Sequence, residues 1–185
     1  MNDIVGGSIT IDGQDLSLMS RDTIRRNIAV LPQDPVLLEG SLRFNLDPFG
    51  EHSDVEITSA LADVDLGHLC ETPDALDAAL ETDKLSAGQK QLLCIARALM
   101  SRSKFLMLDE ATSAVDRETE DKIVKLVHEK FGGCTVIAVA HRLRTLLEFD
   151  WILVMEQGQI VEQGKPSDLL AQKDGRWRQL WDDQQ

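Results

Sequence analysis

Apolar and polar residues follow two different periods along the chain, and together these periods predict an α/β fold. Short apolar runs at 28–31, 105–108 and 135–139 have the length and composition of buried strands. Between and after them, apolar residues recur three and four positions apart, which is typical of amphipathic helices. Strands that alternate with helices along a chain favour a mostly parallel sheet with helices packed on it.

The best-defined helix is predicted to begin at Ser86. Ser86 suits an N-cap, and apolar residues three, four and seven positions apart follow it, at Leu92, Ile95, Ala96 and Leu99. Gly88 lets the backbone come close to whatever lies at the helix start. Because the first N–H groups of a helix have no partners within it, residues 86–89 are a candidate anion site. The alternative interpretation is an ordinary capped core helix.

Two adjacent acids, Asp109 and Glu110, follow the apolar run 105–108. Ligands of open α/β sheets lie beyond the carboxyl ends of the strands, so both acids are predicted at that edge. Adjacent carboxylates repel each other unless a cation or a hydrogen-bond network holds them. An Asp at such a position can hold magnesium, and a neighbouring Glu can deprotonate an attacking water. In the alternative interpretation, Glu110 merely starts the next turn.

The other predicted elements are local. They are listed here in chain order: a strand at 8–13, a helix at 21–26, a short helix from Ser41, a helical region at 53–80 that opens with a Ser53–Glu56 capping box, a helix capped by Asp116, a hairpin around 157–159, and helices near 166–170 and 177–181. Ile123, Leu126 and Val127 form the expected buried stripe of the helix after Asp116.

Three sequence motifs resemble those of one family. The segment LSAGQKQLLCIARAL (85–99) resembles the signature motif of ATP-binding cassette (ABC) nucleotide-binding domains, with Ala87 where glycine is commonest. FLMLDE (105–110) resembles their Walker B strand, and SAVD (113–116) resembles their D-loop. Because three motifs occur in this order and spacing, the chain is identified as resembling that family.

Further segments extend the resemblance. LPQDP (31–35) is similar to the family's Q-loop, and His141 after the run 135–139 is similar to its switch histidine. Without this resemblance, Gln33 would be interpreted as a solvent-facing loop residue and His141 as a structural histidine. Residues 36–49 resemble subfamily C, the multidrug-resistance-associated group, especially its second cassette.

The resemblance implies a P-loop NTPase-like (RecA-like), mostly parallel sheet with an inserted helical subdomain. Residues 36–100 would be that subdomain, and residues 1–35 and 101–185 the α/β core of a single domain. ATP and Mg²⁺ are the implied cofactors. Asp109 and Gln33 would contact the metal, while Glu110, His141 and Gln33 would be the catalytic residues of ATP hydrolysis.

The same resemblance implies partners. A second nucleotide-binding domain would sandwich ATP head-to-tail, with Ser86, Ala87, Gly88 and Gln89 facing the partner's nucleotide and Asp116 at the dimer interface. Transmembrane domains of the same transporter would be driven by this cycle. The expected location is therefore the cytosolic face of a membrane, in an export transporter whose substrate cannot be identified from these residues.

One family motif, the phosphate-cradling G-x-x-x-x-G-K-[ST] loop, is not found in the sequence. The stretch from Gly158 to Lys165 has one residue too many between its glycines and lies in a predicted hairpin. The resemblance thus implies a cassette that is N-terminally incomplete. We expect the chain alone neither to bind ATP tightly nor to hydrolyse it, and to expose apolar sheet. An inactive truncated product or a dimerisation partner without ATPase activity is the alternative.

Composition narrows the classes of function. The 185 residues carry a formal net charge of −13, with 43% hydrophobic and 28% charged residues. This charge disfavours nucleic acid as a partner, and with it a soluble ABC ATPase acting on nucleic acid or ribosomes. No apolar run approaches the ~20 residues that span a bilayer, and the N-terminus does not resemble a signal peptide. Three widely spaced cysteines fit reduced thiols in the cytosol.

Overall fold

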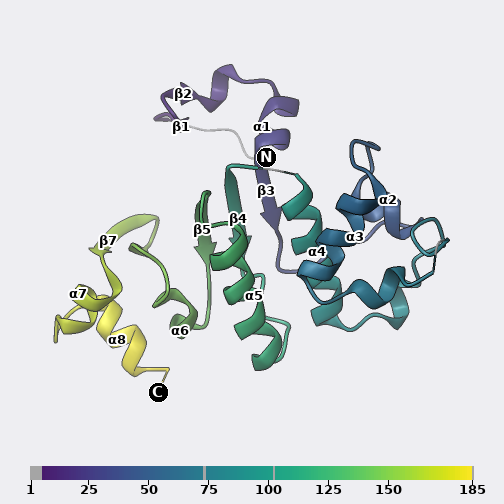
Figure 1. Cartoon of the computed structure of the whole chain (residues 1–185). Coiled ribbons are helices and arrows are strands. Elements are labelled where there is room, and N and C mark those ends of the chain that lie inside the picture. The colour runs from purple at the N-terminus through teal and green to yellow at the C-terminus, as the bar shows by residue number, and fades with distance from the viewer. Residues whose placement is uncertain (1–5, 73, 102, 185) are drawn as a thin grey trace.

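A three-stranded parallel sheet lies at the centre of the structure, a computed structural model that describes residues 6–72, 74–101 and 103–184. Its strands are β3 (Ile28–Leu31), β4 (Phe105–Asp109) and β5 (Thr135–Val139), in the order β3-β4-β5. β4 therefore lies between the other two (Figure 1). These are the three strands that the apolar runs predict, so the expected α/β fold with a parallel sheet is confirmed.

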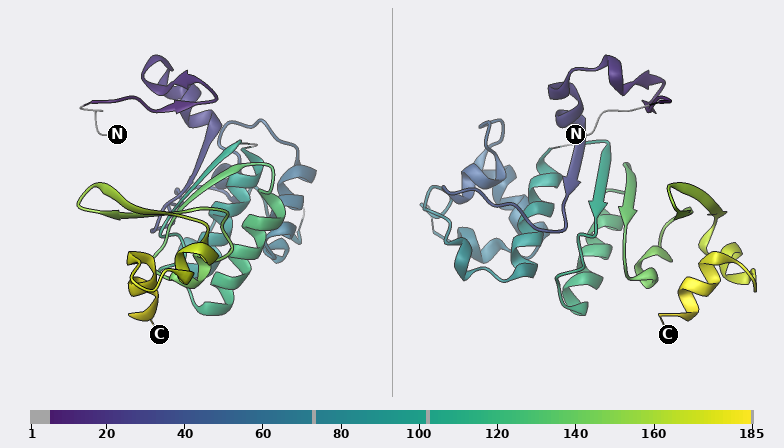
Figure 2. Two further views of the ribbon diagram at one scale, coloured as in Figure 1. Left: turned by 90° about the vertical axis from the view of Figure 1, so that its left-hand side faces the viewer. Right: turned by 180° about the vertical axis from the view of Figure 1, so that it is seen from behind.

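Two long helices, α4 (Ala87–Met100) and α5 (Arg117–Lys130), cover one face of this sheet. The side view in Figure 2 shows both helices on the same side of the strands. Successive right-handed crossovers from β3 to β4 and from β4 to β5 explain this placement. Side chains from both helices and from the inward-facing positions of the strands form one large hydrophobic core.

The opposite face of the sheet is exposed. Val30, Met107 and Ile137 are neighbours in the strand register and are 56%, 40% and 47% exposed. The prediction that residues 135–139 are fully buried is therefore wrong, because only Val136 and Ala138 of β5 face the helices and even they are half-buried. The apolar run reflects a strand with two apolar faces of which the described residues cover one.

The segment between β3 and α4 is mainly helical. It contains α2 (Leu42–Leu46), α3 (Asp54–Asp63) and the short 3₁₀ helices η2 (Gly67–Cys70) and η3 (Thr82–Lys84). The capping box that predicts α3 is present. The predicted continuous helical region over 53–80 is wrong beyond residue 63, because Asp65 adopts a left-handed φ of 59° that ends the helix. Pro73, within that range, lies outside the described residues.

The first described elements form a small separate layer. β1 (Thr10–Ile11) pairs antiparallel with β2 (Gln14–Asp15) across a turn at Asp12 and Gly13, both with positive φ. The strand predicted over 8–13 is thus shorter than expected. η1 (Leu16–Leu18) and α1 (Arg21–Asn27) then lead into β3.

The C-terminal elements pack around their own hydrophobic cluster, made of Leu143, Ile152, Val154, Leu169 and Trp177. They are α6 (Leu143–Leu146), the hairpin of β6 (Ile152–Glu156) and β7 (Gln159–Gly164), α7 (Pro166–Ala171) and α8 (Arg176–Asp182). In Figure 1 these elements lie beside β5 and away from the helical segment. The three cysteines are free thiols, and no helix in the described ranges is long and apolar enough to cross a membrane.

Candidate functional site

The ends of three parallel strands bring polar residues to one edge of the sheet. Asp109 is the last residue of β4 and pairs with Val139 at the end of β5. Leu31 of β3 pairs with Leu108, so the loop that contains Gln33 leaves the sheet beside Asp109. The register therefore places Gln33, Asp109 and the residues after Val139 at the same carboxyl edge, where ligands of α/β sheets bind.

Glu110 and His141 are in direct contact at this edge. Their side chains approach to 2.8 Å between His141 Nε2 and Glu110 Oε1, with Glu110 22% and His141 74% exposed. The structure thus brings together two residues that stand 31 positions apart. An imidazole beside a carboxylate can share or relay a proton, which is the chemistry that general acid–base catalysis needs.

Glu110 also has an unusual backbone. Its φ is 50°, in the left-handed region that residues other than glycine seldom adopt. Its N–H donates to Val139 O at 2.9 Å, and its carbonyl accepts from Ser113 N at 2.9 Å. Glu110 therefore does start the next turn, as the alternative interpretation holds. Its backbone is strained, however, and residues with strained backbones are found mainly at functional sites.

The start of α4 is built as the sequence predicts, with Ser86 as N-cap. Ser86 N donates to Gln89 Oε1 at 3.0 Å, and Gln89 N donates to Ser86 Oγ at 3.2 Å. This capping box occupies two of the four N–H groups expected to be unpaired at 86–89. The N–H groups of Ala87 and Gly88 have no acceptor among the hydrogen bonds of the described residues. They are the remaining donors for an anion.

Asp116 lies close to this helix start because α4 and α5 begin side by side. A Cβ added at Gly88 would lie 3.0 Å from Thr119 Cγ2, so glycine allows the two helices to pack. Asp116 is the N-cap of α5 and accepts from the N–H of Thr119 at 3.0 Å and from its hydroxyl at 2.7 Å. These two hydrogen bonds hold the pKa of Asp116 below its ordinary value.

Polar side chains of α4 hold the loop that carries Gln33, a role that sequence reasoning missed. Gln91, almost fully buried, donates to Pro32 O at 3.2 Å. Arg97 donates to Asn45 O at 2.6 Å and to Val36 O at 3.1 Å. Gln33 itself is exposed at the surface of the loop. The helix that begins at Ser86 is therefore physically connected to the Gln33 loop.

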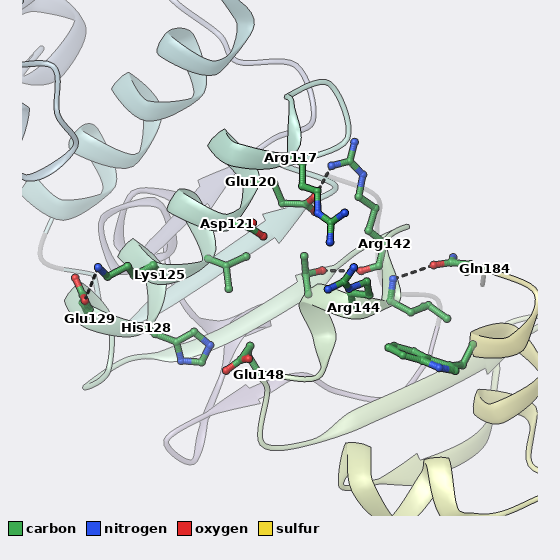
Figure 3. A pocket seen from close by; sticks show the side chains of 14 residues that line it. Arg117, Glu120, Asp121, Lys125, His128, Glu129, Arg142, Arg144, Glu148 and Gln184 are labelled. Carbon is green, nitrogen blue, oxygen red and sulfur yellow. Dashed lines mark hydrogen bonds and ion pairs between the residues drawn. The ribbon is translucent and has the colours of Figure 1, made fainter.

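The second contact that sequence reasoning missed is between Glu120 and Arg142, the residue after His141. Glu120 is only 4% exposed and accepts from Thr112 Oγ1 at 3.1 Å and from Arg142, which forms an ion pair with it. Figure 3 shows this pair at the side of an open groove of about 830 Å³. In the sequence, Glu120 is one of several acids that follow the Asp116 cap, where acids suit the positive end of the helix dipole. Its spacing of three and seven from Ile123 and Val127 is the signal that could have placed it on the buried face.

Taken together, the parallel sheet, the polar strand ends and the helix starts at one edge define an α/β nucleotide-binding domain of the P-loop NTPase class. Residues 2–113 match the profile of the ABC transporter family, which covers more than half of the chain. The chain therefore belongs to the ABC transporter family.

Individual relatives support the subfamily. ATP-binding cassette sub-family C member 2 of Rattus norvegicus is 45% identical over 174 residues, which are 91% of this chain and 11% of the relative. The oligomycin resistance ATP-dependent permease of Saccharomyces cerevisiae is 41% identical over 200 residues, 97% of this chain and 14% of the permease. The resemblance to subfamily C is thus confirmed. The chain spans only a small part of the length of these relatives.

A solved structure agrees with the fold. A bacterial Atm1-family ABC exporter with ATP bound superposes with a TM-score of 0.87 and 34% sequence identity, covering 98% of this chain and 33% of the exporter chain. The P-loop NTPase-like fold expected from the motifs is therefore confirmed over almost the whole chain.

Proposed function

We propose that this chain forms part of an ATP-binding cassette that hydrolyses ATP to power export by a subfamily C ABC transporter. The observation that carries the proposal is the 2.8 Å contact between Glu110 and His141 at the sheet edge where Asp109 ends β4. The membership of the ABC transporter family and the ATP-bound exporter of the same fold support it.

Glu110 is the proposed general base for the attacking water. His141 holds the Glu110 carboxylate in place and contacts the terminal phosphate, which its exposed side chain is free to reach. Gln33 orients the same water from the neighbouring strand end. A base within hydrogen-bond reach of a group that orients it is the arrangement that activated-water chemistry needs.

Asp109 and Gln33 are the proposed protein contacts of Mg²⁺. No three His, Cys, Asp or Glu side chains of the described chain gather as a metal site. One exposed carboxylate and a side-chain amide at adjacent strand ends nevertheless fit Mg²⁺, which is held by one or two protein oxygens with water and substrate phosphates. When bound, the ion would neutralise charge on the transferred phosphate.

Ser86, Ala87, Gly88, Gln89 and Asp116 are proposed to serve a second nucleotide-binding domain. The free N–H groups of Ala87 and Gly88 at the positive end of a 14-residue helix suit a phosphate. The capping box of Ser86 and Gln89 leaves these two groups without an acceptor among the described residues. In a head-to-tail dimer they would meet the partner's ATP, with the Asp116 cap at the interface.

We further propose that residues 36–100 act as the helical subdomain and that residues 1–35 and 101–185 belong to the α/β core. In the assembled cassette, another strand and helix would cover the exposed row Val30–Met107–Ile137, since parallel sheets are normally covered on both faces. Transmembrane domains of the transporter would hold the cassette at the cytosolic face of a membrane.

A chimera tests the proposal. Residues 1–185 would replace the matched segment of the yeast permease named for oligomycin resistance, and growth on oligomycin and ATPase activity of the purified chimera would be measured. We expect activity in the chimera and a loss of at least about 100-fold with Glu110→Gln, because general-base catalysis contributes roughly 10²–10⁴-fold. Glu129→Gln, on the exposed end of α5, is the matched control. A Glu110→Gln chimera with normal ATPase turnover would overturn the proposal.

A further inference from the structure

We infer that Gln184 and Glu120 are positioning residues that hold the turn 141–143 and thereby aim His141 at Glu110. This inference rests on the proposed ATPase function, because it assigns residues that set the geometry of the proposed catalytic pair. Neither residue belongs to the motifs that identify the family in this sequence.

Gln184 forms hydrogen bonds with the backbone on both sides of residue 142. Its Nε2 donates to His141 O at 2.6 Å, and its Oε1 accepts from Leu143 N at 3.1 Å. Figure 3 shows the Gln184 side chain directed toward this turn. A side-chain amide that pairs with a donor and an acceptor of one turn fixes the position of the main chain there, and not only the distance to a single atom.

Gln184 is itself attached to a well-packed element. It follows α8, whose Trp177 is 2% exposed in the C-terminal cluster and whose Trp177 N donates to Glu162 Oε2 at 2.6 Å. The amide therefore links the His141 turn to the end of α8, 41 to 43 positions away in the chain, in addition to the packing of Leu143 in the same cluster.

Glu120 holds the same turn from a different element, α5, through the side chain of Arg142. The buried Glu120 carboxylate forms an ion pair with the Arg142 guanidinium, which also donates to Val115 O at 3.4 Å. Thr112 Oγ1 donates to the other oxygen of Glu120 at 3.1 Å. Glu120 thus connects the His141 turn with residues 112–115, which lie between Glu110 and Asp116.

These two contacts add to the packing of Leu143, and they matter because the side chain of His141 is itself not packed. Its side chain is 74% exposed, so packing does not restrict its rotamers, and Glu110 is its one side-chain partner among the described residues. The direction of the imidazole therefore depends on where the main chain of the turn is fixed. A displacement of about 1 Å at a catalytic group is enough to cost a large part of the rate.

The test uses the purified permease chimera, with kcat and KM for ATP measured separately. We expect Gln184→Ala and Glu120→Gln each to lower kcat about tenfold with an unchanged KM, because the nucleotide contacts remain while the catalytic pair is misaligned. Gln184→Glu keeps the acceptor for Leu143 N but loses the donor to His141 O, so it should retain an intermediate kcat. Gln179→Ala on α8 and Glu129→Gln on α5 are the matched controls and should leave kcat unchanged.

Two reference variants separate the possible failures. If His141→Ala abolishes turnover while Gln184→Ala and Glu120→Gln keep the wild-type kcat, the positioning role is wrong and the proposed function stands. If Glu110→Gln is fully active, the proposed function is wrong; if Glu110→Gln is inactive but His141→Ala is fully active, the positioning role is wrong, because aiming His141 would then not matter. Thermal unfolding of each variant identifies a folding defect. If Glu120→Gln does not fold, Gln184→Ala alone tests the positioning role, because residue 184 is exposed. A merely structural role of Gln184 predicts a lower unfolding temperature with an unchanged kcat per folded molecule, whereas the positioning role predicts a lower kcat.

Discussion

Gly88 and Thr119 meet where α4 and α5 begin, and a side chain on residue 88 would fit only if Thr119 moved by a few tenths of an ångström. An added Cβ would lie 3.0 Å from Thr119 Cγ2 and 3.2 Å from its Oγ1. Thr119 cannot easily move away, because its N–H and its hydroxyl both bind the Asp116 carboxylate. The glycine of the signature segment therefore has a packing role within this chain, beside the role proposed for its N–H group.

We expect Gly88→Ala to destabilise the chain by about 1–2 kcal/mol, since overpacking costs roughly 1–3 kcal/mol and the gain in helix propensity returns at most ~1 kcal/mol. A double-mutant cycle with Thr119→Ala, followed by urea unfolding, measures the contact directly. The two substitutions should be coupled favourably by at least about 0.5 kcal/mol. Strict additivity would show that the contact does not limit packing.

The left-handed backbone of Glu110 leads to a second prediction. Glu110→Gly should give a chain about 1 kcal/mol more stable than Glu110→Ala, because a φ of 50° costs an L-residue roughly 1–2 kcal/mol and glycine nothing. Both variants lose the His141 contact equally, so that contact cancels in the comparison. The free energy of unfolding in urea is the measurement, and equal stabilities would mean that the left-handed φ carries no strain. In the chimera both should be inactive, which would make residue 110 a site where stability and activity conflict.

Local elements were predictable from the sequence because their signals are local. Capping boxes at Ser53 and Ser86, and the cap at Asp116, lie within three residues of the groups they bind, so they mark helix starts without knowledge of the fold. The three strands of the parallel sheet follow from short apolar runs in the same way.

Contacts between distant segments could not be read from the same signals. Nothing near Gln184 in the sequence points to His141, and Arg97 meets Val36 only because α4 packs beside the loop after β3. The exposure of Ile137 depends on which face of the sheet is covered, and an apolar run does not tell one covered face from two. The contacts within the candidate site could therefore be known only from the structure, whereas Glu110, His141 and the other motif residues could be named from the sequence.

Asp47 should make stability depend on pH. Burial alone would raise the pKa of Asp47, but the N–H groups of Glu51, at 3.1 Å, and His52, at 2.7 Å, outweigh it and hold the pKa below its ordinary value. Because the folded pKa is lowered, this stabilisation is present above the unfolded pKa of about 3.9 and is lost as the pH falls through the folded value.

Asp47→Asn should therefore cost about 1–2 kcal/mol at neutral pH, since hydrogen bonds to a charged group are the stronger kind. The difference from wild type should begin to shrink as the pH falls below the unfolded pKa of about 3.9, and it should disappear once the pH has passed through the lower pKa of the folded Asp47 carboxyl. Unfolding in urea across this pH range is the measurement, with the exposed Asp83→Asn as control. A difference that stays constant down to acid pH would contradict the role of the carboxylate charge.

Arg97 should stabilise the loop that carries Gln33. Its guanidinium bridges Asn45 O and Val36 O, two acceptors that a single lysine ammonium cannot reach with the same geometry. We expect Arg97→Lys to lower stability by about 1–2 kcal/mol and to speed cleavage by proteases within residues 33–39. Arg25→Lys, on the exposed surface of α1, should change neither quantity. Unchanged proteolysis of the Arg97 variant would mean that the loop is held by other contacts.

A substitution at Met107 tests whether the exposed face of the sheet is covered in the assembled cassette. In the 185-residue chain, Met107→Lys should reduce self-association, measured by light scattering, because it interrupts the exposed row between Val30 and Ile137. In the chimera the same substitution should destabilise the cassette by at least about 2 kcal/mol, since it would bury an unpaired ammonium against the covering segment. Val55→Lys, at an exposed position of α3, controls for added charge and should be tolerated in both. If the chimera tolerates lysine at residue 107 with full ATPase activity, this face stays open to solvent in the assembled cassette and the proposed covering strand and helix do not pack there.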